Sequence, residues 1–168
     1  QKAQRLKQLS DHLFEYALIT SETKTQLDPA TSFQTALFDV LSEMAAFLQQ
    51  QGYTVDLALT WEPRTIRVSG DYIARISDNL VSNFLKYADP AFPISIRTEY
   101  DGTWASLVLE NRARPVGPQV ESTKIGLHNI RAMIQNMAGR CDIETEADRF
   151  RLALRFPCLP PRLESGPA

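Results

Sequence analysis

The stretch at residues 78–87, DNLVSNFLKY, is the most informative part of this sequence. Asn79, Asn83 and Lys86 lie at positions i, i+4 and i+7, so on an α-helix they fall within roughly 60° of one another on one face. Asn is a poor helix former, and two of them in mid-helix beside an apolar stripe are unusual. A solvated polar face is the plain interpretation. The alternative is the rim of a ligand site, where an amide oxygen coordinates a hard cation and an ammonium group meets phosphate.

The helix that carries this stretch is the centre of the predicted architecture. Its apolar residues keep three- and four-residue spacing from a capping Asp71 to Pro90. Strands arrive in hairpin pairs between helices, which favours an α+β fold, a two-layer sandwich whose mixed or antiparallel sheet has its helices on one face. The other predicted elements are helices at 1–20, 33–51 and 127–138, the last two ended by Gly52 and Gly139, a linker at 21–29, strands at 53–60, 64–69, 94–100, 104–111, 141–146 and 150–156, and a loop at 112–123.

Composition excludes several classes of protein. The chain has 168 residues, a formal net charge of −2 and only 7 glycines, none of them clustered. The GxGxxG and Walker loops need clustered glycines, so a dinucleotide fold and a P-loop ATPase are excluded. Mild acidity without a basic block argues against nucleic acid as a partner. No apolar run approaches the ~18 residues of a membrane span, and Cys141 and Cys158 are expected to be reduced thiols in a cytoplasmic setting.

Residues 78–87 resemble the N box, NLxxNAxKY, of bacterial two-component sensor histidine kinases. Residues 5–20, RLKQLSDHLFEYALIT, are similar to the end of the second dimerisation helix of that family. The strand end at 107–111 lies where the G1 box begins, and 124–127, KIGL, resembles the G2 box. The resemblance covers about residues 5–157 and extends to some VanS-like kinases. It implies the GHKL, or Bergerat, fold shared with DNA gyrase, a heat-shock chaperone family and MutL repair proteins, with a mixed sheet and three helices on one face.

The resemblance implies roles for the N-box residues. Asn83 would be the Mg²⁺ ligand that ties the metal to the triphosphate of ATP. Lys86 would neutralise phosphate, and Tyr87 would pack near the ribose or the base. Asn79 occupies the position where the ATP-hydrolysing relatives carry a Glu that activates water. Because an amide cannot act as a general base, the site is expected to hold ATP for transfer of its phosphoryl group and not for hydrolysis.

The G1 and G2 boxes depart from the family pattern. Asn111 falls where the DxGxG motif has the Asp that accepts a hydrogen bond from the adenine amino group, and an Asn carbonyl keeps that acceptor. The two glycine positions become Ala113 and Pro115, and a strand-end turn residue is the alternative interpretation of Asn111. Gly126 opens a helix whose N–H groups could meet phosphate. The implied ATP-binding residues are Asn79, Asn83, Lys86, Tyr87, Asn111, Lys124, Gly126 and Leu127.

Neither histidine fits the phosphoacceptor of a histidine kinase. His12 is followed by Leu13 and not by an acidic residue, and it lies in what resembles the second dimerisation helix. His128 lies in the first turn of the helix after Gly126 and is interpreted as a surface residue. No residue of this chain is therefore assigned as catalytic. The chain starts at Gln1, and we expect it to be a fragment that begins downstream of the phosphoacceptor.

The resemblance divides the chain and implies its function. Residues 1–23 would be the end of the dimerisation helix and a linker, 24–157 the catalytic domain and 158–168 a disordered tail. The function would be to bind Mg-ATP and transfer the γ-phosphoryl to a histidine of the protein's own dimerisation domain, for signalling to a response regulator. The parent would be a membrane-anchored homodimer with this domain in the cytoplasm, and the fragment a monomer or a dimer. Two alternatives are a degenerate GHKL module that acts by protein contact or phosphatase support, and an anti-sigma serine kinase, which the helix at 1–20 disfavours.

Overall fold

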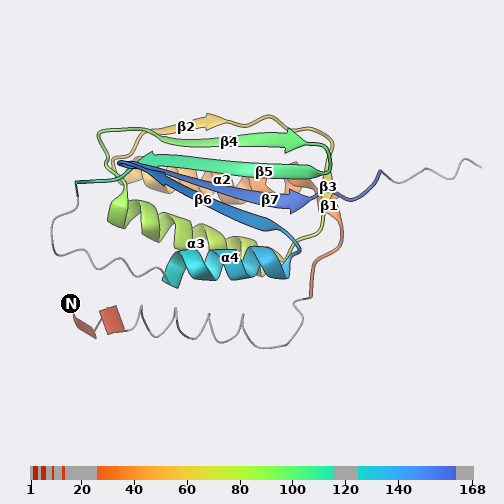
Figure 1. Cartoon of the computed structure of the whole chain (residues 1–168), viewed down its shortest axis with the longest axis horizontal. Helices are drawn as coiled ribbons and strands as arrows, with labels where there is room; N and C mark the ends of the chain where they lie inside the picture. Colours follow the sequence, from red (N-terminus) through yellow and green to blue (C-terminus); the bar gives the residue numbers. More distant parts are fainter. Residues whose placement is uncertain are drawn as a thin grey trace, which may run out of the picture.

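The computed structural model describes residues 2, 3, 5, 6, 9, 13, 26–115 and 125–161, and the six residues at the start are helical. The rest forms one five-stranded sheet with helices on one of its faces (Figure 1). His12 and most of the predicted helix at 1–20 lie outside the described residues. The elements are β1 Thr31–Ser32, α2 Phe33–Gln50, β2 Val55–Ala58, β3 Thr65–Ile66, α3 Gly70–Tyr87, β4 Ile94–Asp101, β5 Trp104–Arg112, α4 Ile125–Asn136, β6 Arg140–Glu146 and β7 Arg149–Pro157.

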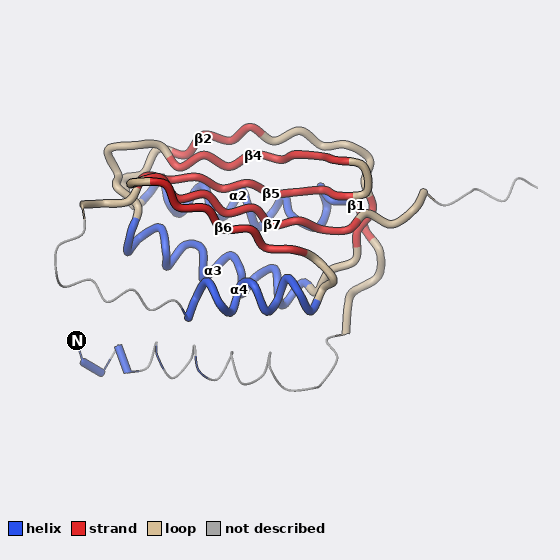
Figure 2. Tube along the Cα trace, viewed as in Figure 1, coloured by secondary structure: helices blue, strands red, loops and turns tan. Residues whose placement is uncertain are grey.

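The sheet has the order β2-β4-β5-β7-β6, and β1 and β3 form a separate antiparallel pair. β2 runs parallel to β4, whereas the other neighbours are antiparallel, so the sheet is mixed as predicted. All helices in the described ranges lie beneath one face (Figure 2). Alternate residues of the central strands point at them and form the core, because successive side chains of a strand face opposite sides. These buried residues include Ile94, Ile96, Leu107, Leu109, Leu152 and Leu154.

α2 begins and ends where the sequence predicts. The Ser32 hydroxyl accepts a hydrogen bond from the backbone N–H of Thr35 at 3.0 Å, and thus caps the helix. Gly52 has a φ of +93°, a value that a residue with a side chain rarely adopts. The stripe predicted from the three- and four-residue spacing is buried, with Phe33 and Leu48 fully enclosed.

The N-terminal cap of α3 differs from the prediction. The sequence favours Asp71, but the cap is Ser69, whose hydroxyl accepts from the N–H of Tyr72 at 3.3 Å. A second cap comes from the linker, since Asp28 Oδ2 accepts from the N–H of Gly70 at 2.8 Å. Asp71 lies one residue too late, inside the first turn. Asp28 could not be found by local reading, because the helix it caps begins 42 residues later.

The end of α4 also departs from the prediction. The sequence predicts that the helix ends at Gly139, yet the residue with the left-handed conformation is Ala138, with a φ of +61°. Gly139 is needed for a different reason. A Cβ placed on it would lie 2.5 Å from the carbonyl oxygen of Arg155 and 2.9 Å from Cγ2 of Ile134. The glycine therefore permits a close approach between the end of α4 and β7.

One strand is shorter than predicted, and the ordered chain after β7 is longer than predicted. The strand expected at 64–69 is reduced to Thr65–Ile66, which pairs with the unpredicted β1. Beyond β7, the N–H of Cys158 donates to the Thr103 carbonyl at 2.6 Å and that of Leu159 to the Thr65 carbonyl at 2.8 Å. The chain is thus attached to the domain up to two residues past the predicted end of the catalytic domain at residue 157. Among the described helices, none has the length and apolarity of a membrane span.

Candidate functional site

The C-terminal end of α3 is joined to the chain that follows β5. Ala88 and Ala113 form an antiparallel bridge, and the N–H of Arg114 donates to the Tyr87 carbonyl at 2.7 Å. These contacts place the last turns of α3, which carry the polar stretch at 78–87, beside the end of β5, which carries Asn111. Two segments that are far apart in sequence are thereby fixed at one edge of the sheet.

The backbone carbonyls at this end of α3 have side-chain partners. The Tyr53 hydroxyl lies 3.2 Å from the carbonyl oxygens of both Phe84 and Ala88. Arg114 donates from Nε to the Ala88 carbonyl at 2.9 Å and from Nη2 to the Tyr53 hydroxyl at 3.0 Å. A helix leaves its last carbonyls without intrahelical partners, and here a buried tyrosine and an arginine supply donors. The backbone of the site is therefore rigid and hydrogen-bonded.

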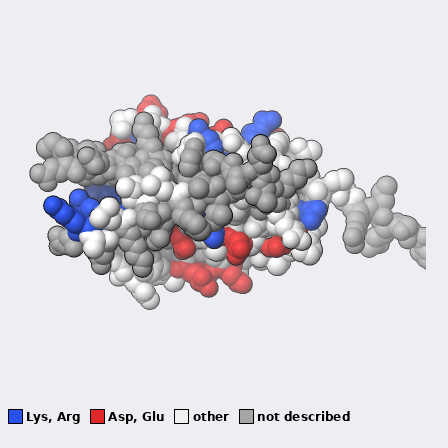
Figure 3. All heavy atoms as spheres, turned by 90° about the horizontal axis from the view of Figure 1, so that it is seen from below, with Lys and Arg blue, Asp and Glu red and all other residues white. Residues whose placement is uncertain are grey.

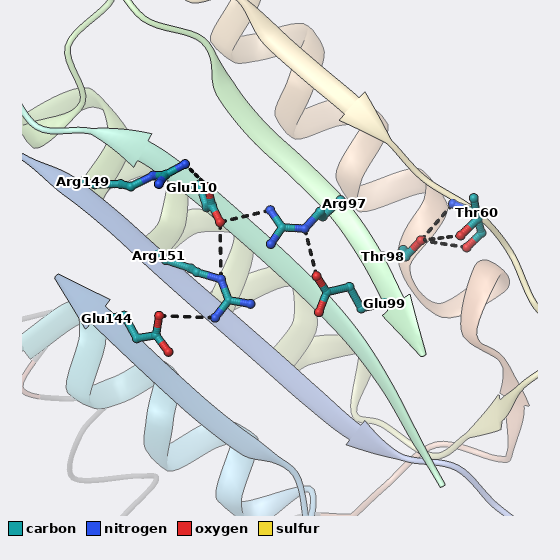
Figure 4. Close-up of polar contacts among 8 residues, drawn as sticks. All are labelled: Thr60, Arg97, Thr98, Glu99, Glu110, Glu144, Arg149 and Arg151. Atoms are coloured by element: carbon teal, nitrogen blue, oxygen red, sulfur yellow. Dashed lines mark hydrogen bonds and ion pairs between the residues drawn. The ribbon is translucent and has the colours of Figure 1, made fainter. Parts of the chain in front are cut away.

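The contacts of Glu110 show on which face of the sheet Asn111 lies. On the outer face, Glu110 Oε1 accepts from Arg97 Nη1 at 3.1 Å and pairs with Arg151 Nε at 3.3 Å (Figure 4). Arg149 Nη2 lies 3.6 Å from Glu110 Oε2. Because neighbouring side chains of a strand point to opposite faces, this outer network leaves Asn111 on the inner, helix-covered face. Asn111 is 7% exposed there.

A pocket of about 680 Å³ lies between α3, α4 and the adjoining ends of β5, β6 and β7. This volume is in the range of small-molecule sites, which are mostly apolar with a few polar groups. The side chains that line it are largely aliphatic and aromatic, as such a site requires. They include Leu80, Phe84, Tyr87, Leu109, Leu127, Ile143, Phe150 and Leu152.

The structure brings five of the predicted residues together here. Asn83, Tyr87, Asn111 and Leu127 all line the pocket, although they come from three separate stretches of sequence. Gly126, which does not line it, lies against the N-box face, since a Cβ added to it would be 3.6 Å from Asn83 Oδ1. The first turn of α4 therefore faces the polar line of α3.

Of the other predicted ATP-binding residues in the described ranges, Asn79 and Lys86 do not line the pocket. Asn79 is 5% exposed, and no hydrogen-bond partner for its Nδ2 is present among the described residues. Lys86 is exposed in the last turn of α3. Lys124 lies outside the described residues. His128, interpreted from sequence as a surface residue, is exposed and borders the pocket.

Sequence reasoning missed the wall formed by α4 and the β6–β7 hairpin. Arg131, Thr145, Asp148 and Phe150 line the pocket from this side, and Asp148 Oδ2 pairs with Arg112 Nη1 at 3.3 Å. The alternation of the predicted strands could have indicated Phe150 as inward-facing, because its Cα is paired with that of Asn111. Nothing local to Asp148 distinguishes it from an ordinary turn residue.

The cysteine nearest this wall has a perturbed pKa. Burial raises the pKa of the Cys141 thiol to about 11, although the neighbouring Arg131 guanidinium acts in the opposite direction. A protonated thiol is a poor nucleophile and a poor metal ligand at neutral pH. Cys141 is partly buried and packs against the core.

Charge is unevenly distributed over the helix side of the molecule. Seen from below, Lys and Arg side chains gather at the left end and Asp and Glu side chains nearer the middle (Figure 3). The left end is where α3 finishes and α4 begins (Figure 1). The described lining of the pocket itself includes the basic side chains Arg131 and Arg149 and one carboxylate, that of Asp148.

No protein-family model matches the chain. It is 30% identical over 155 residues to the sensor histidine kinase YrkQ of Bacillus subtilis (strain 168), an alignment that covers 92% of this chain. The chain is a homologue of sensor histidine kinases. It spans 36% of the length of that relative. The resemblance inferred from the N box is therefore confirmed, whereas the VanS-like subgroup stays a prediction.

Solved sensor histidine kinases have the same fold. The chain matches Acinetobacter baumannii AdeS with a TM-score of 0.70 and 16% identity, over 92% of this chain and 79% of that one. It matches ThkA in complex with the response regulator TrrA with a TM-score of 0.73 and 15% identity, over 95% and 50%. The ThkA catalytic domain alone gives 0.63 and 15%, over 79% and 97%. The predicted α+β sandwich is thus confirmed as the fold of histidine kinase catalytic domains.

Proposed function

We propose that this chain is the ATP-binding catalytic domain of a sensor histidine kinase, which binds Mg-ATP in the pocket between α3 and α4. The observation that carries the proposal is that one pocket gathers Asn83, Tyr87, Asn111 and Leu127 from the N box and the two degenerate G boxes. A solved relative in fold, full-length ShkA, is in complex with AMPPNP, which supports a nucleotide as the ligand.

The residues present fit a metal–nucleotide complex. The apolar walls suit a purine ring, and Asn111 provides a buried amide at the inner end of β5. Asn83 would hold Mg²⁺, because amide oxygens are suitable ligands for a hard cation. Backbone N–H groups of the first turn of α4, a helix of 12 residues beginning beside Asn83, would bind phosphate oxygens. When bound, Mg-ATP supplies the phosphoryl group and part of the charge neutralisation for its transfer.

The chain's own part in the reaction is positioning. Phosphoryl transfer depends mainly on geometry and on neutralising charge, and it requires little covalent chemistry from the protein. Lys86 and Lys124 are proposed as the phosphate-neutralising cations. Asn79 contributes no general base, and the Asp148 carboxylate in the pocket wall is paired with Arg112. We therefore propose that the phosphoryl group is kept for a histidine and not transferred to water.

The remaining parts of the proposal concern the protein around this domain. We propose that residues 1–23 end a dimerisation helix and its linker, and that the catalytic domain runs from residue 24 to Leu159. The phosphoacceptor histidine would lie on the parent's own dimerisation domain. ThkA has been solved in complex with a response regulator, and we propose the same class of partner for this chain. Membrane anchoring and homodimerisation of the parent belong to the same proposal.

Calorimetric titration with the non-hydrolysable analogue AMPPNP, with and without Mg²⁺, tests nucleotide binding directly. We expect one site whose affinity rises when Mg²⁺ is added. Absence of heat at millimolar nucleotide would refute the proposal and favour the degenerate module, which the comparisons do not favour. A chain extended upstream to include a phosphoacceptor helix, incubated with labelled ATP, should then carry label on a histidine.

A further inference from the structure

We infer that the pocket accepts guanine as well as adenine nucleotides, and that Asn111 is the residue that sets this tolerance. The inference rests on the proposed function, because it concerns the base of the same bound nucleotide. It goes beyond that function by naming the purine edge that is read.

The backbone position of Asn111 is firmly fixed. Its Cα is paired with that of Phe150 in the β5–β7 ladder, and the preceding Glu110 is held by arginines on the opposite face. The side chain is 7% exposed and lines the pocket. A group so placed meets the ligand at a defined point, where it acts on base selectivity more than on general affinity.

The orientation of the Asn111 amide, by contrast, is not fixed by any residue in the described ranges. Over residues 26–115 and 125–161 no hydrogen bond to its side-chain oxygen or nitrogen is found. Rotation about the last torsion of Asn exchanges the oxygen and the nitrogen, and the two arrangements are nearly equal in shape. Either the oxygen or the nitrogen of the amide can therefore face the ligand, depending on which one forms a hydrogen bond with it.

The two purines present opposite patterns to such a group. Adenine offers an amino donor beside a ring-nitrogen acceptor, and guanine offers a carbonyl acceptor beside a ring N–H donor. An amide has one acceptor and one donor, so it can form two hydrogen bonds with adenine and, turned over, two with guanine. An ionised carboxylate only accepts hydrogen bonds, and it would meet the guanine carbonyl with repulsion. With an amide at position 111, this repulsion of the guanine carbonyl is absent.

The walls of the pocket provide little discrimination between the two bases. They are mainly aliphatic and aromatic, and these side chains contact the faces of a purine, which adenine and guanine share. Thr145 has a hydroxyl that both donates and accepts, and the carboxylate of Asp148 is engaged by Arg112. His128, Arg131 and Arg149 also line the pocket, but their side chains are exposed. Among the polar residues that line the pocket in the described ranges, Asn111 is the buried one, so it is the group placed to distinguish the two edges.

Competition binding of ATP, GTP and ITP against a fluorescent ATP analogue, with saturating Mg²⁺, tests the inference on the unaltered chain. ITP has the guanine-like edge without the 2-amino group, so it separates edge recognition from room for that group. We expect both GTP and ITP to bind within about tenfold of ATP. If GTP binds more than tenfold more weakly than ATP, the inference is overturned while the proposed function stands, and the ITP affinity then shows whether the edge or the 2-amino group is rejected. If no nucleotide binds, the proposed function itself fails.

The variant Asn111→Asp should restore a preference for adenine. We expect it to weaken ITP binding by tenfold or more relative to ATP, since a good bidentate contact discriminates by about that factor or more. Gln135→Glu makes the same change of charge at an exposed position of α4 that does not line the pocket, and it should leave the ITP-to-ATP ratio unchanged. An Asn111→Asp protein that binds the three nucleotides in the wild-type ratio would contradict the assigned role.

Discussion

The two ends of α3 differ in how their polar groups are satisfied. At the N-terminal end, Ser69 and Asp28 accept hydrogen bonds from the free N–H groups of the first turn. At the other end the backbone is also satisfied, but Asn79 Nδ2 is buried without a partner in the described part of the chain, and the Asn111 side chain lines the pocket. Buried polar groups without partners cost stability. The first end therefore stabilises the fold, and the second is organised for a ligand.

The difference lies in the side chains and not in the backbone. Arg67 Nε donates to the Asp28 carbonyl at 3.2 Å, so even the linker that reaches the N-terminal end is hydrogen-bonded to the domain. At the pocket end, Tyr53 and Arg114 hold the backbone while the amides stay available. Substitutions at the first end should therefore change stability alone, and those at the second should change binding first.

Asn83→Ala should have the largest effect and should act on binding alone. We expect the affinity for Mg-ATP to fall on the order of tenfold to a hundredfold, because a ligand to a charged group is lost. The free energy of unfolding should stay within about 0.5 kcal/mol of wild type, since Asn83 is only partly buried. Calorimetric titration and urea unfolding measure the two quantities. Ser82→Ala in the same turn is the control, and equal affinity in both variants would remove Asn83 from the site.

Glu110→Ala tests the outer support of the pocket end. The Glu110 side chain is 18% exposed and is the acceptor shared by Arg97 and Arg151, which would keep only their more exposed partners Glu99 and Glu144 after its removal. We expect a loss of about 2 kcal/mol in unfolding free energy, below the cost of breaking a fully buried pair. Glu110→Gln retains the shape and should lose less. An Ala variant as stable as wild type would show that the network does not hold β5.

Ser69→Ala and Asp28→Ala test the capped end. Each removes a side-chain acceptor for a first-turn N–H of α3, which typically costs about 1 kcal/mol. Urea unfolding should show that loss, and nucleotide affinity should not change. Asp71→Asn is the matched control, because Asp71 is not the cap and should contribute only a few tenths of a kcal/mol through the helix dipole. A larger loss at Asp71 than at Ser69 would reverse the assignment of the cap.

Asn79→Leu tests whether the unpartnered amide of α3 lowers the stability of the domain. The substitution replaces an amide that has a buried Nδ2 without a described partner by an apolar side chain of similar size. Removing an unsatisfied group should leave the unfolding free energy unchanged or raise it by up to about 1 kcal/mol. Thermal and urea unfolding measure this directly. A clear loss of stability would show that Nδ2 is hydrogen-bonded within the folded protein.

The last prediction concerns pH and Cys141, away from both ends of α3. The folded-state pKa of this thiol is about 11, against an ordinary value of 9.0. Between pH 9 and pH 11 the folded protein thus keeps a thiol proton that the unfolded chain loses. The contribution of this thiol to the free energy of unfolding is therefore complete below pH 9 and declines as the pH rises toward 11. Urea unfolding at pH 8 and pH 10.5 should show this decline in wild type and a smaller one in Cys141→Ala. Identical slopes would mean that burial does not perturb the thiol.

The sequence predicted the described helices well, because they depend on local spacing, and two of the four N-box residues, Asn83 and Tyr87, line the pocket. The three- and four-residue periodicity located α2, α3 and α4, and the polar line of Asn79 and Asn83 indicated a ligand rim. The choice of Ser69 over Asp71 was not predictable, because both residue types cap helices well. Local spacing is also blind to partners that arrive from elsewhere, as Asp28 does at α3.

The second wall of the pocket was missed for a related reason. Thr145 and Asp148 reach the site only because β6 and β7 fold back beside β5. Their position depends on sheet order, which follows from the packing of the whole domain and not from any motif. The strand alternation that buries Phe150 was visible, but its pairing with Asn111 was not.

The short strand β3 has a mechanical consequence for the whole domain. The incoming chain pairs with it through β1, and the outgoing chain is tied to the same strand by the N–H of Leu159. The chain before α2 and the chain after β7 are thus both attached to β3, which lies at the end of the molecule opposite the pocket (Figure 1). A pulling force applied to the chain before β1 and after Leu159 would therefore act on β3 and its contacts, and it would not act on the pocket. A fluorophore attached after Leu159 would accordingly report movement of the linker and be insensitive to nucleotide.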